Sequence, residues 1–266
     1  MPNTKMTGAK FRNHVFYNKY IYGLIAIVAV LLGNLLFSTT AYRAPNARRI
    51  DIEMVGAYVN TATDATKEVQ AQLLAAGKEW EIQRDAEAGV DVQAEDYEPA
   101  LQELEILGLD YSGEGTSEND YYAAQKFMVL LAAQEGDIYL ISRTLMTDLA
   151  DQGLLVPLDG YIEDGLLYTG DRSLGKVTFD ELDENEKATG VQHVYALQAT
   201  PMTGLTDAFS YDTTDKYVCI MAFSQNPDTA AAVIHEMQVL FEPGAFGAEI
   251  PEDEAVSDGD AQETQP

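Results

Sequence analysis

From residue 50 onward, short apolar runs alternate with amphipathic segments along the chain. The run 137–142, DIYLIS, is apolar at successive positions, which is typical of a strand buried on both faces of a parallel sheet. Other runs rich in β-branched and apolar residues also predict strands. These predicted strands are 50–59, 101–111, 191–199 and 216–223. Because helical segments separate them, the pattern predicts an α/β domain built on a parallel sheet.

The segments between the strands carry helix signals at their ends. One helix is predicted to start at Thr63 or Asp64, which are good N-cap residues, and to stop at Gly77. The last begins at Asn226-Pro227, a cap residue followed by proline at the first helical position. The helix at 120–134 is predicted to bury Ala124, Phe127, Met128 and Leu131, and the short helix ended by Gly153 to bury Leu145, Met146 and Leu149. The last helix is predicted to bury Ala230, Val233, Ile234, Met237 and Phe241.

Some segments leave the pattern open. Residues 78–99 fit either a short strand with an acidic loop or a continuation of the preceding helix. Residues 162–190 read as an acidic loop, and DELDENE within it lacks the spacing of a calcium-binding loop. Residues 248–266 are acidic and polar, which predicts a disordered tail.

The segment before residue 50 is different in kind. Residues 20–42 contain no charge and begin with the apolar run YIYGLIAIVAVLLGNLLF. A bilayer requires about 20 mostly apolar residues as helix, so this length favours a transmembrane anchor over a cleaved signal peptide. Cleavage near Thr39-Thr40-Ala41 or Tyr42-Arg43-Ala44 is the alternative. A buried core helix is disfavoured, because apolar residues occupy every face of the run.

Charge is divided unevenly about this run. The chain of 266 residues has a net charge of −28, yet residues 1–50 hold seven basic residues and no acidic one. The remainder therefore carries 9 basic against 44 acidic residues, a net charge of −35 that would repel a nucleic acid. We expect residues 1–19 to be cytoplasmic and basic, residues 20–42 to cross the cell membrane once, and residues 50–247 to form an extracellular domain.

A resemblance to a known family arises from three segments. The first is residues 137–162, DIYLISRTLMTDLADQGLLVPLDGYI. It resembles a segment of the extracellular solute-binding proteins of ABC transporters in which a strand leads to a loop, a short helix and the motif leu-x-pro-leu-asp. VYALQA resembles the strand that leaves the first lobe of those proteins through the hinge. YVCIMAFSQNPDTAAAVIHEM resembles the returning strand with its following helix. The resemblance covers about residues 50–165 and 191–242, and it implies a periplasmic-binding-protein-like lobe.

The chain departs from that family in two ways. Members usually insert a second lobe between the outgoing and returning strands, whereas here only residues 200–215 intervene, too few for a domain. Members in single-membrane bacteria commonly carry a lipidated cysteine, whereas the lone Cys219 lies far from the apolar run. The sequence therefore resembles a single-lobed, membrane-anchored derivative.

Catalytic motifs are incomplete throughout. His235-Glu236 begins an HExxH pattern, but residue 239 is Val where the second histidine would stand. Gly113-Glu114-Gly115 lacks the further glycine and lysine of a phosphate-binding loop. We therefore expect a protein that is not an enzyme and that uses neither cofactor nor metal.

A ligand site in an open α/β sheet is favoured at the carboxyl ends of the strands. The predicted ligand-binding residues follow two of the predicted strands and are Tyr121, Tyr122, Ser142 and Arg143. The alternative for Arg143 is an ordinary surface arginine at a helix start, and the alternative for the two tyrosines is packing at a helix start. Two functions fit the sequence. In the first, the protein is a lobe that presents or senses a small solute, such as a sugar or peptide, for a membrane transporter. In the second, it is a module that has lost solute binding and contacts another envelope protein through the Cys219 strand or the acidic tail.

Overall fold

The computed structural model describes residues 20, 24–25, 27–33, 43–111, 118–170, 176–182, 184 and 187–247. The chain divides into two units, residues 1–43 and residues 44–266. In the first unit, residues 27–33 are helical, and their apolar side chains, such as Val30 and Leu31, are exposed. Within the described stretches, no helix has both the length and the apolar character that crossing a bilayer requires.

Several predicted segments fall wholly or partly outside the described residues. The basic segment 1–19 and the tail 248–266 lie outside them, as do residues 21–23, 26 and 34–42 of the predicted anchor. The anchor and its orientation therefore stay predictions.

Six strands in the described part of the second unit form one sheet in the order β2-β1-β3-β6-β5-β4. They are β1 (Arg49–Gly56), β2 (Glu103–Asp110), β3 (Ile138–Ser142), β4 (Lys176–Leu182), β5 (Ala188–Gln198) and β6 (Lys216–Ile220). β1 pairs in parallel with β2 and β3, whereas β6 runs antiparallel to β3 and β5, and β4 antiparallel to β5. The predicted α/β class is confirmed. The prediction of a parallel sheet is correct only for β1, β2 and β3. It fails for the other strands because an apolar run in the sequence does not specify the direction in which its strand runs.

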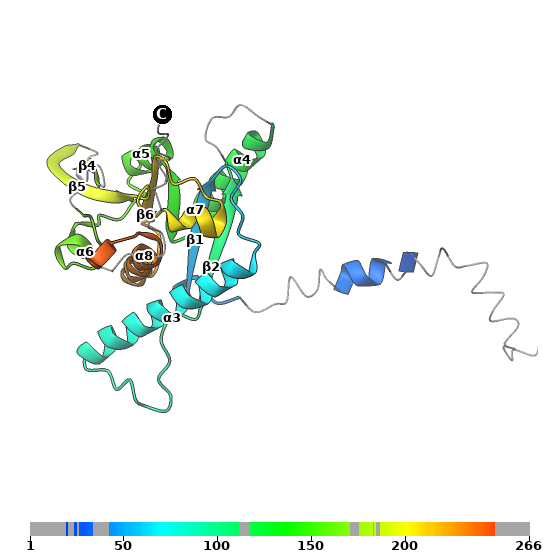
Figure 1. Cartoon of the computed structure of the whole chain (residues 1–266), viewed down its shortest axis with the longest axis horizontal. Helices are drawn as coiled ribbons and strands as arrows, with labels where there is room; N and C mark the ends of the chain where they lie inside the picture. Colours follow the sequence, from blue (N-terminus) through cyan, green and yellow to red (C-terminus); the bar gives the residue numbers. More distant parts are fainter. Residues whose placement is uncertain are drawn as a thin grey trace, which may run out of the picture. The chain divides into compact units, whose positions relative to one another are not determined.

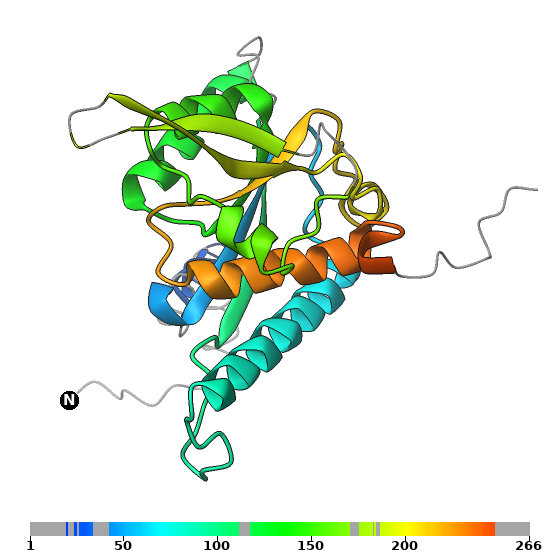
Figure 2. The same ribbon diagram turned by 90° about the vertical axis from the view of Figure 1, so that its left-hand side faces the viewer.

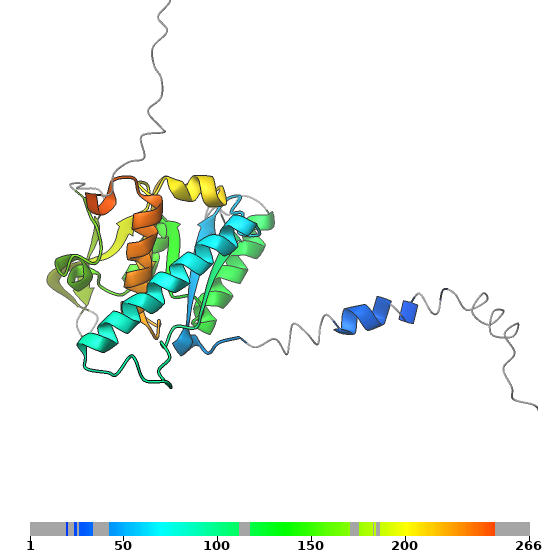
Figure 3. The same ribbon diagram turned by 60° about the horizontal axis from the view of Figure 1, so that its bottom comes forward.

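Helices cover both faces of this sheet (Figure 1). One core lies between the sheet and α3, α7 and α8, and the other between the sheet and α4 and α5. Figures 2 and 3 show α3 and α8 next to each other on one side of the sheet, where they pack together. The helices are η1 (Asn46–Arg48), α3 (Asp64–Glu87), α4 (Glu118–Ala133), α5 (Arg143–Asp151), α6 (Asp159–Glu163), α7 (Gly204–Phe209), α8 (Pro227–Phe241) and η2 (Ala245–Gly247).

α3 is longer than the sequence predicts. Its start is as expected, with the Thr63 side chain accepting a hydrogen bond from the Thr66 amide at 3.1 Å. It does not stop at Gly77 but continues to Glu87, and a loop follows. Gly77 serves packing instead of ending the helix, since a Cβ there would lie 2.6 Å from Leu101 Cδ2. Of the two alternatives for residues 78–99, a continued helix is therefore correct for residues 78–87, and residues 88–99 form a loop.

Two other predictions need correction. Met128 of α4 is exposed, while Phe127 is buried and Ala123 and Leu131 pack beside it, so the buried side of α4 is rotated from the predicted one. Residues 162–190 are not all loop, because β4 and the start of β5 form an antiparallel pair there. Charged residues in DELDENE conceal the strand, because acidic residues are depleted in strands generally. The helix at 227–241 buries the five predicted residues and is confirmed.

Cys219 lies in the interior of the sheet. β6 sits between β3 and β5, the Cys219 side chain is buried, and burial raises the pKa of its thiol to about 12. The prediction that the Cys219 strand offers a contact surface is therefore wrong, because both edges of β6 are already paired.

The burial of Cys219 gives a testable expectation. Because only a thiolate reacts with iodoacetamide, alkylation of the folded chain at pH 8 should be at least about 100-fold slower than alkylation in urea. Mass spectrometry of quenched samples measures both rates. Equal rates would show that the β3-β6-β5 region opens readily.

Candidate functional site

The predicted residues Ser142 and Arg143 lie at the carboxyl end of β3. Ser142 is the N-cap of α5, and its Oγ accepts a hydrogen bond from the Leu145 amide at 3.5 Å. Arg143 donates from Nε to Asp215 Oδ1 at 3.2 Å and from its guanidinium to the Tyr217 hydroxyl. The hydrogen bond to Asp215 raises the pKa of Arg143, so it remains a cation. These bonds fix the Arg143 side chain against the β3-β6 pair.

Tyr121 and Tyr122 lie on the first turns of α4 and are 61% and 59% exposed. Their rings meet edge to face, with centroids 5.9 Å apart. No contact that the structure describes joins them to Ser142 or Arg143. The structure thus brings the four predicted residues together only as two separate pairs, and their role in binding stays a prediction.

The crevice at the carboxyl ends of β1 and β3 is filled by the chain itself. Residues 199–215, which join β5 to β6 and include α7, cross this edge of the sheet. Tyr211 is fully buried there, and its hydroxyl donates toward the carbonyl oxygens of Val55 at 3.1 Å and Leu140 at 2.9 Å. The Asn60 amide also donates to the Phe209 carbonyl at 2.9 Å.

The Tyr211 ring also leaves no space for a side chain at Gly56. A Cβ on Gly56, the last residue of β1, would lie 2.9 Å from Tyr211 Cε2. Burial raises the pKa of Tyr211 well above its ordinary value, so the hydroxyl keeps its proton. Tyr211 therefore occupies the position where a solute would be expected to sit in an open sheet.

A second hollow, which we call the Trp80 groove, lies between α3, α8 and the α6 region. Its two adjoining parts have volumes of about 570 and 320 Å³ and share Trp80, Leu166 and His235. Volumes of this size are typical of ligand pockets. The polar and aromatic side chains of the larger part are Trp80, Arg84, Tyr161, Asp164, Asp228 and His235.

Several contacts shape the Trp80 groove. The Arg84 guanidinium lies over the Trp80 ring at 5.1 Å, and the Tyr161 hydroxyl donates to Asp228 Oδ1 at 2.7 Å. His235 Nδ1 lies 2.7 Å from the Leu166 carbonyl oxygen, so this nitrogen is the donor. Sequence analysis did not find this site, because its residues are far apart in the chain and form no motif.

Glu81, the residue after Trp80 in α3, holds α3 and α8 together. Its buried side chain accepts hydrogen bonds from the Leu101 amide at 2.7 Å and from Thr229 Oγ1 at 2.9 Å. One carboxylate thereby joins α3 to the start of α8 and to the segment before β2.

Replacing Glu81 with Ala should lower the free energy of unfolding by about 3 kcal/mol, because it removes the acceptor from two buried donors. Urea denaturation followed by circular dichroism measures the loss. Glu79→Ala, an exposed change on the same helix, is the control and should change stability by about 0.5 kcal/mol or less. Similar losses in the two variants would contradict a bridging role for Glu81.

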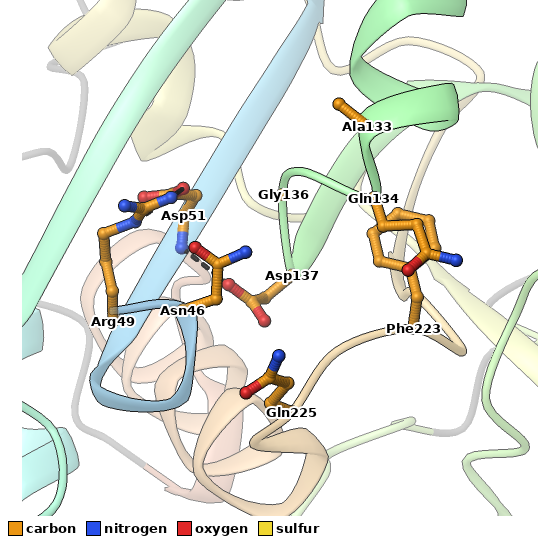
Figure 4. Close-up of a pocket in the computed structure, with 9 residues that line it drawn as sticks. All are labelled: Asn46, Arg49, Asp51, Ala133, Gln134, Gly136, Asp137, Phe223 and Gln225. Carbon is orange, nitrogen blue, oxygen red and sulfur yellow. Dashed lines mark hydrogen bonds and ion pairs between the residues drawn. The ribbon is translucent and has the colours of Figure 1, made fainter. Parts of the chain in front are cut away.

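A small polar pocket lies at the other end of these two strands, beside the amino ends of β1 and β3 (Figure 4). Arg49 and Asp51 form a buried ion pair at 2.7 Å. Asp137 accepts hydrogen bonds from the Asp51 amide at 3.0 Å and from Ser224 Oγ at 2.6 Å. Burial raises the pKa of Asp137, and these two donors and Arg49 partly offset that effect. At about 80 Å³ the pocket is too small for an organic solute, so its polar groups serve to join the ends of β1, β3 and β6.

Among the described residues, no group of three or more His, Cys, Asp or Glu side chains is placed so that it could hold a metal ion. Comparison of the chain with known proteins found no matching family model, no matching curated protein and no matching solved structure.

Proposed function

We propose that this protein is a membrane-anchored, non-enzymatic module of the cell envelope that binds another envelope protein and does not trap a solute. The observation that carries the proposal is the filled crevice, because Tyr211 and the 199–215 connection occupy the place of a ligand. A binding protein with two lobes closes around its solute at a hinge. Here β5 leaves and β6 returns beside it as an antiparallel neighbour, with only that connection between them.

The same arrangement supports the resemblance to one lobe of a solute-binding protein. That resemblance predicts an outgoing strand at VYALQA and a returning strand at the start of YVCIMAF, and residues 194–198 lie in β5 and residues 217–220 in β6. The exposed apolar side chains at residues 27–33 support the anchor in the lipid bilayer through residues 20–42. The domain would then face the outside of the cell.

The outer surface of α4 is the contact surface that we favour. Four apolar or aromatic side chains of α4 are each about 60% exposed: Tyr121, Tyr122, Met128 and Val129. Met128 and Val129 lie seven residues, or about two helical turns, after Tyr121 and Tyr122, so the four share one side of the helix. Contiguous exposed apolar patches on a protein surface mark interaction sites. The tyrosines thus have a role in this proposal that does not require a solute.

Site-specific photo-crosslinking in native membranes tests this proposal. A photoreactive phenylalanine analogue at Met128 should give a defined, saturable crosslink to one protein, whereas the same group at Asp151 of α5 should not. Crosslinks of equal yield from both positions, or from neither, would contradict partner binding through α4.

Solute presentation to a transporter is the second candidate, favoured by the partly exposed Arg143 guanidinium at the end of β3. A thermal-shift screen of the chain in detergent against sugars, amino acids, short peptides and calcium distinguishes the two, because a ligand of the folded state raises the melting temperature. We expect no shift. A rise that disappears in Arg143→Ala or Tyr121→Ala would support the solute-binding function instead.

A further inference from the structure

We propose that the Trp80 groove is a docking site for a cationic peptide segment, one that carries Arg or Lys side chains between small apolar residues. The groove lies on the α3 and α8 side of the sheet, away from the outer surface of α4. It is therefore a site additional to the contact surface proposed above. Its residues come from three parts of the fold: α3, the α6 region and α8.

Charge is the first reason for a cationic occupant. Four carboxylates line the two parts of the groove, Glu79, Asp164, Asp228 and Glu236, and Arg84 is the one Lys or Arg side chain in that lining. Arg84 is already paired with Asp85 at 2.9 Å, outside the lining. Four carboxylates against one paired cation give this lining a negative potential, which attracts a cationic ligand and repels an anionic one.

The Trp80 ring is the second, independent reason. Arg84 lies over this indole with its guanidinium carbon 5.1 Å from the ring centroid, a cation–π contact, so a guanidinium of the ligand would stack on the other face of the ring or take the place of Arg84. Trp80 is half-buried, and Tyr161 presents a second aromatic ring in the same hollow. Aromatic rings beside carboxylates are the combination that recognises Arg and Lys side chains.

The form of the groove favours a peptide over a free metal ion or a small amine. The larger hollow of about 570 Å³ continues into one of about 320 Å³ along α3 and α8. Ala76, Leu166 and Ala232 provide apolar surface between the charged groups. An extended segment could place basic side chains against the carboxylates and small apolar ones against this surface.

Trp80 is the only tryptophan in the sequence, so its fluorescence reports on the groove directly. The test titrates the full chain in detergent micelles with the peptide acetyl-(Arg-Ala)5-amide. The comparison peptides are acetyl-(Glu-Ala)5-amide and acetyl-(Ser-Ala)5-amide, and maltotriose represents a sugar. We expect a saturable change in fluorescence with the arginine peptide alone.

Two matched double variants separate the groove from general electrostatic attraction by this acidic chain. Asp164→Asn with Glu79→Gln removes two groove charges and should weaken binding of the arginine peptide at least about 10-fold. Asp148→Asn with Asp151→Asn removes two exposed charges from α5 and should weaken it about 2-fold or less. Trp80→Phe, followed by anisotropy of a labelled arginine peptide, should weaken it about 5-fold because Phe is the poorer cation–π partner.

Three outcomes would overturn the proposal. One is the absence of a saturable response to the arginine peptide, and another is equal weakening by the two double variants. The third is a stronger response to maltotriose or to the neutral peptide, which would assign the groove to a different class of ligand. Since none of these variants alters α4, the crosslinking result at Met128 stands or fails separately.

Discussion

Replacing Tyr211 with Ala should lower the free energy of unfolding by about 4 kcal/mol, the largest loss that we expect from a single side chain in this protein. The ring is fully buried against the ends of β1 and β3, and its removal leaves both a cavity and two carbonyl groups without their donor. Tyr211→Phe keeps the ring and should cost about 1 to 3 kcal/mol. Urea denaturation followed by circular dichroism measures both losses.

The Tyr211→Ala variant also tests whether the side chain fills a ligand-like position. Apolar cavities made by truncation can bind small aromatic molecules. We therefore expect p-cresol, which has the shape of the tyrosine side chain, to raise the melting temperature of Tyr211→Ala and not that of the wild type. Tyr58→Phe, on an exposed residue, is the control for loss of a hydroxyl and should be neutral. A stability loss below about 1 kcal/mol in Tyr211→Ala would show that the connection does not close the crevice tightly.

Replacing Gly136 with Ala should lower the free energy of unfolding by about 3 kcal/mol. Gly136 precedes β3 with φ of +88°, a conformation that costs a residue with a side chain about 1 to 2 kcal/mol. A Cβ at this position would also lie 2.6 Å from Tyr139 Cε2 and 3.0 Å from Glu53 Cγ, and such overpacking costs about 1 to 3 kcal/mol.

Gly153→Ala provides the matched control for Gly136. Gly153 has a φ of +68°, but a Cβ there would meet nothing within 4 Å, so only the conformational cost remains. Its loss should be about 1 to 2 kcal/mol. Thermal or urea denaturation of both variants measures the difference, and equal losses would show that the contact with Tyr139 is relieved by a local shift.

Local signals in the sequence predicted the elements that depend on neighbouring residues. The cap at Thr63, the apolar strand at 138–142 and the Asn226-Pro227 start of α8 each follow from side chains within a few positions. Gly77 misled because glycine often ends a helix, and only the approach of Leu101, from 24 positions along the chain, explains its presence inside α3. Likewise, the acidic residues at 180–184 hid β4, whose formation depends on pairing with β5.

The candidate site was predictable only in part for the same reason. Ser142 and Arg143 were placed at a strand end, and the structure puts them there. Tyr211 could not be found from the sequence, because its role arises from the return of β6 between β3 and β5. Trp80 and His235 meet only because α3 packs against α8, and no spacing in the sequence encodes that contact.

The filled crevice also sets a quantitative limit on the affinity of any solute that competes for it. A side chain on the same chain competes at a high and constant effective concentration, which no dilution of the protein reduces. If expelling Tyr211 costs about 4 kcal/mol, the apparent affinity of a solute at this position falls by roughly a thousandfold, since every 1.4 kcal/mol is a factor of ten. A solute with an intrinsic micromolar dissociation constant would therefore bind only at about millimolar concentration, and the closed state would persist through ordinary changes in the surrounding medium.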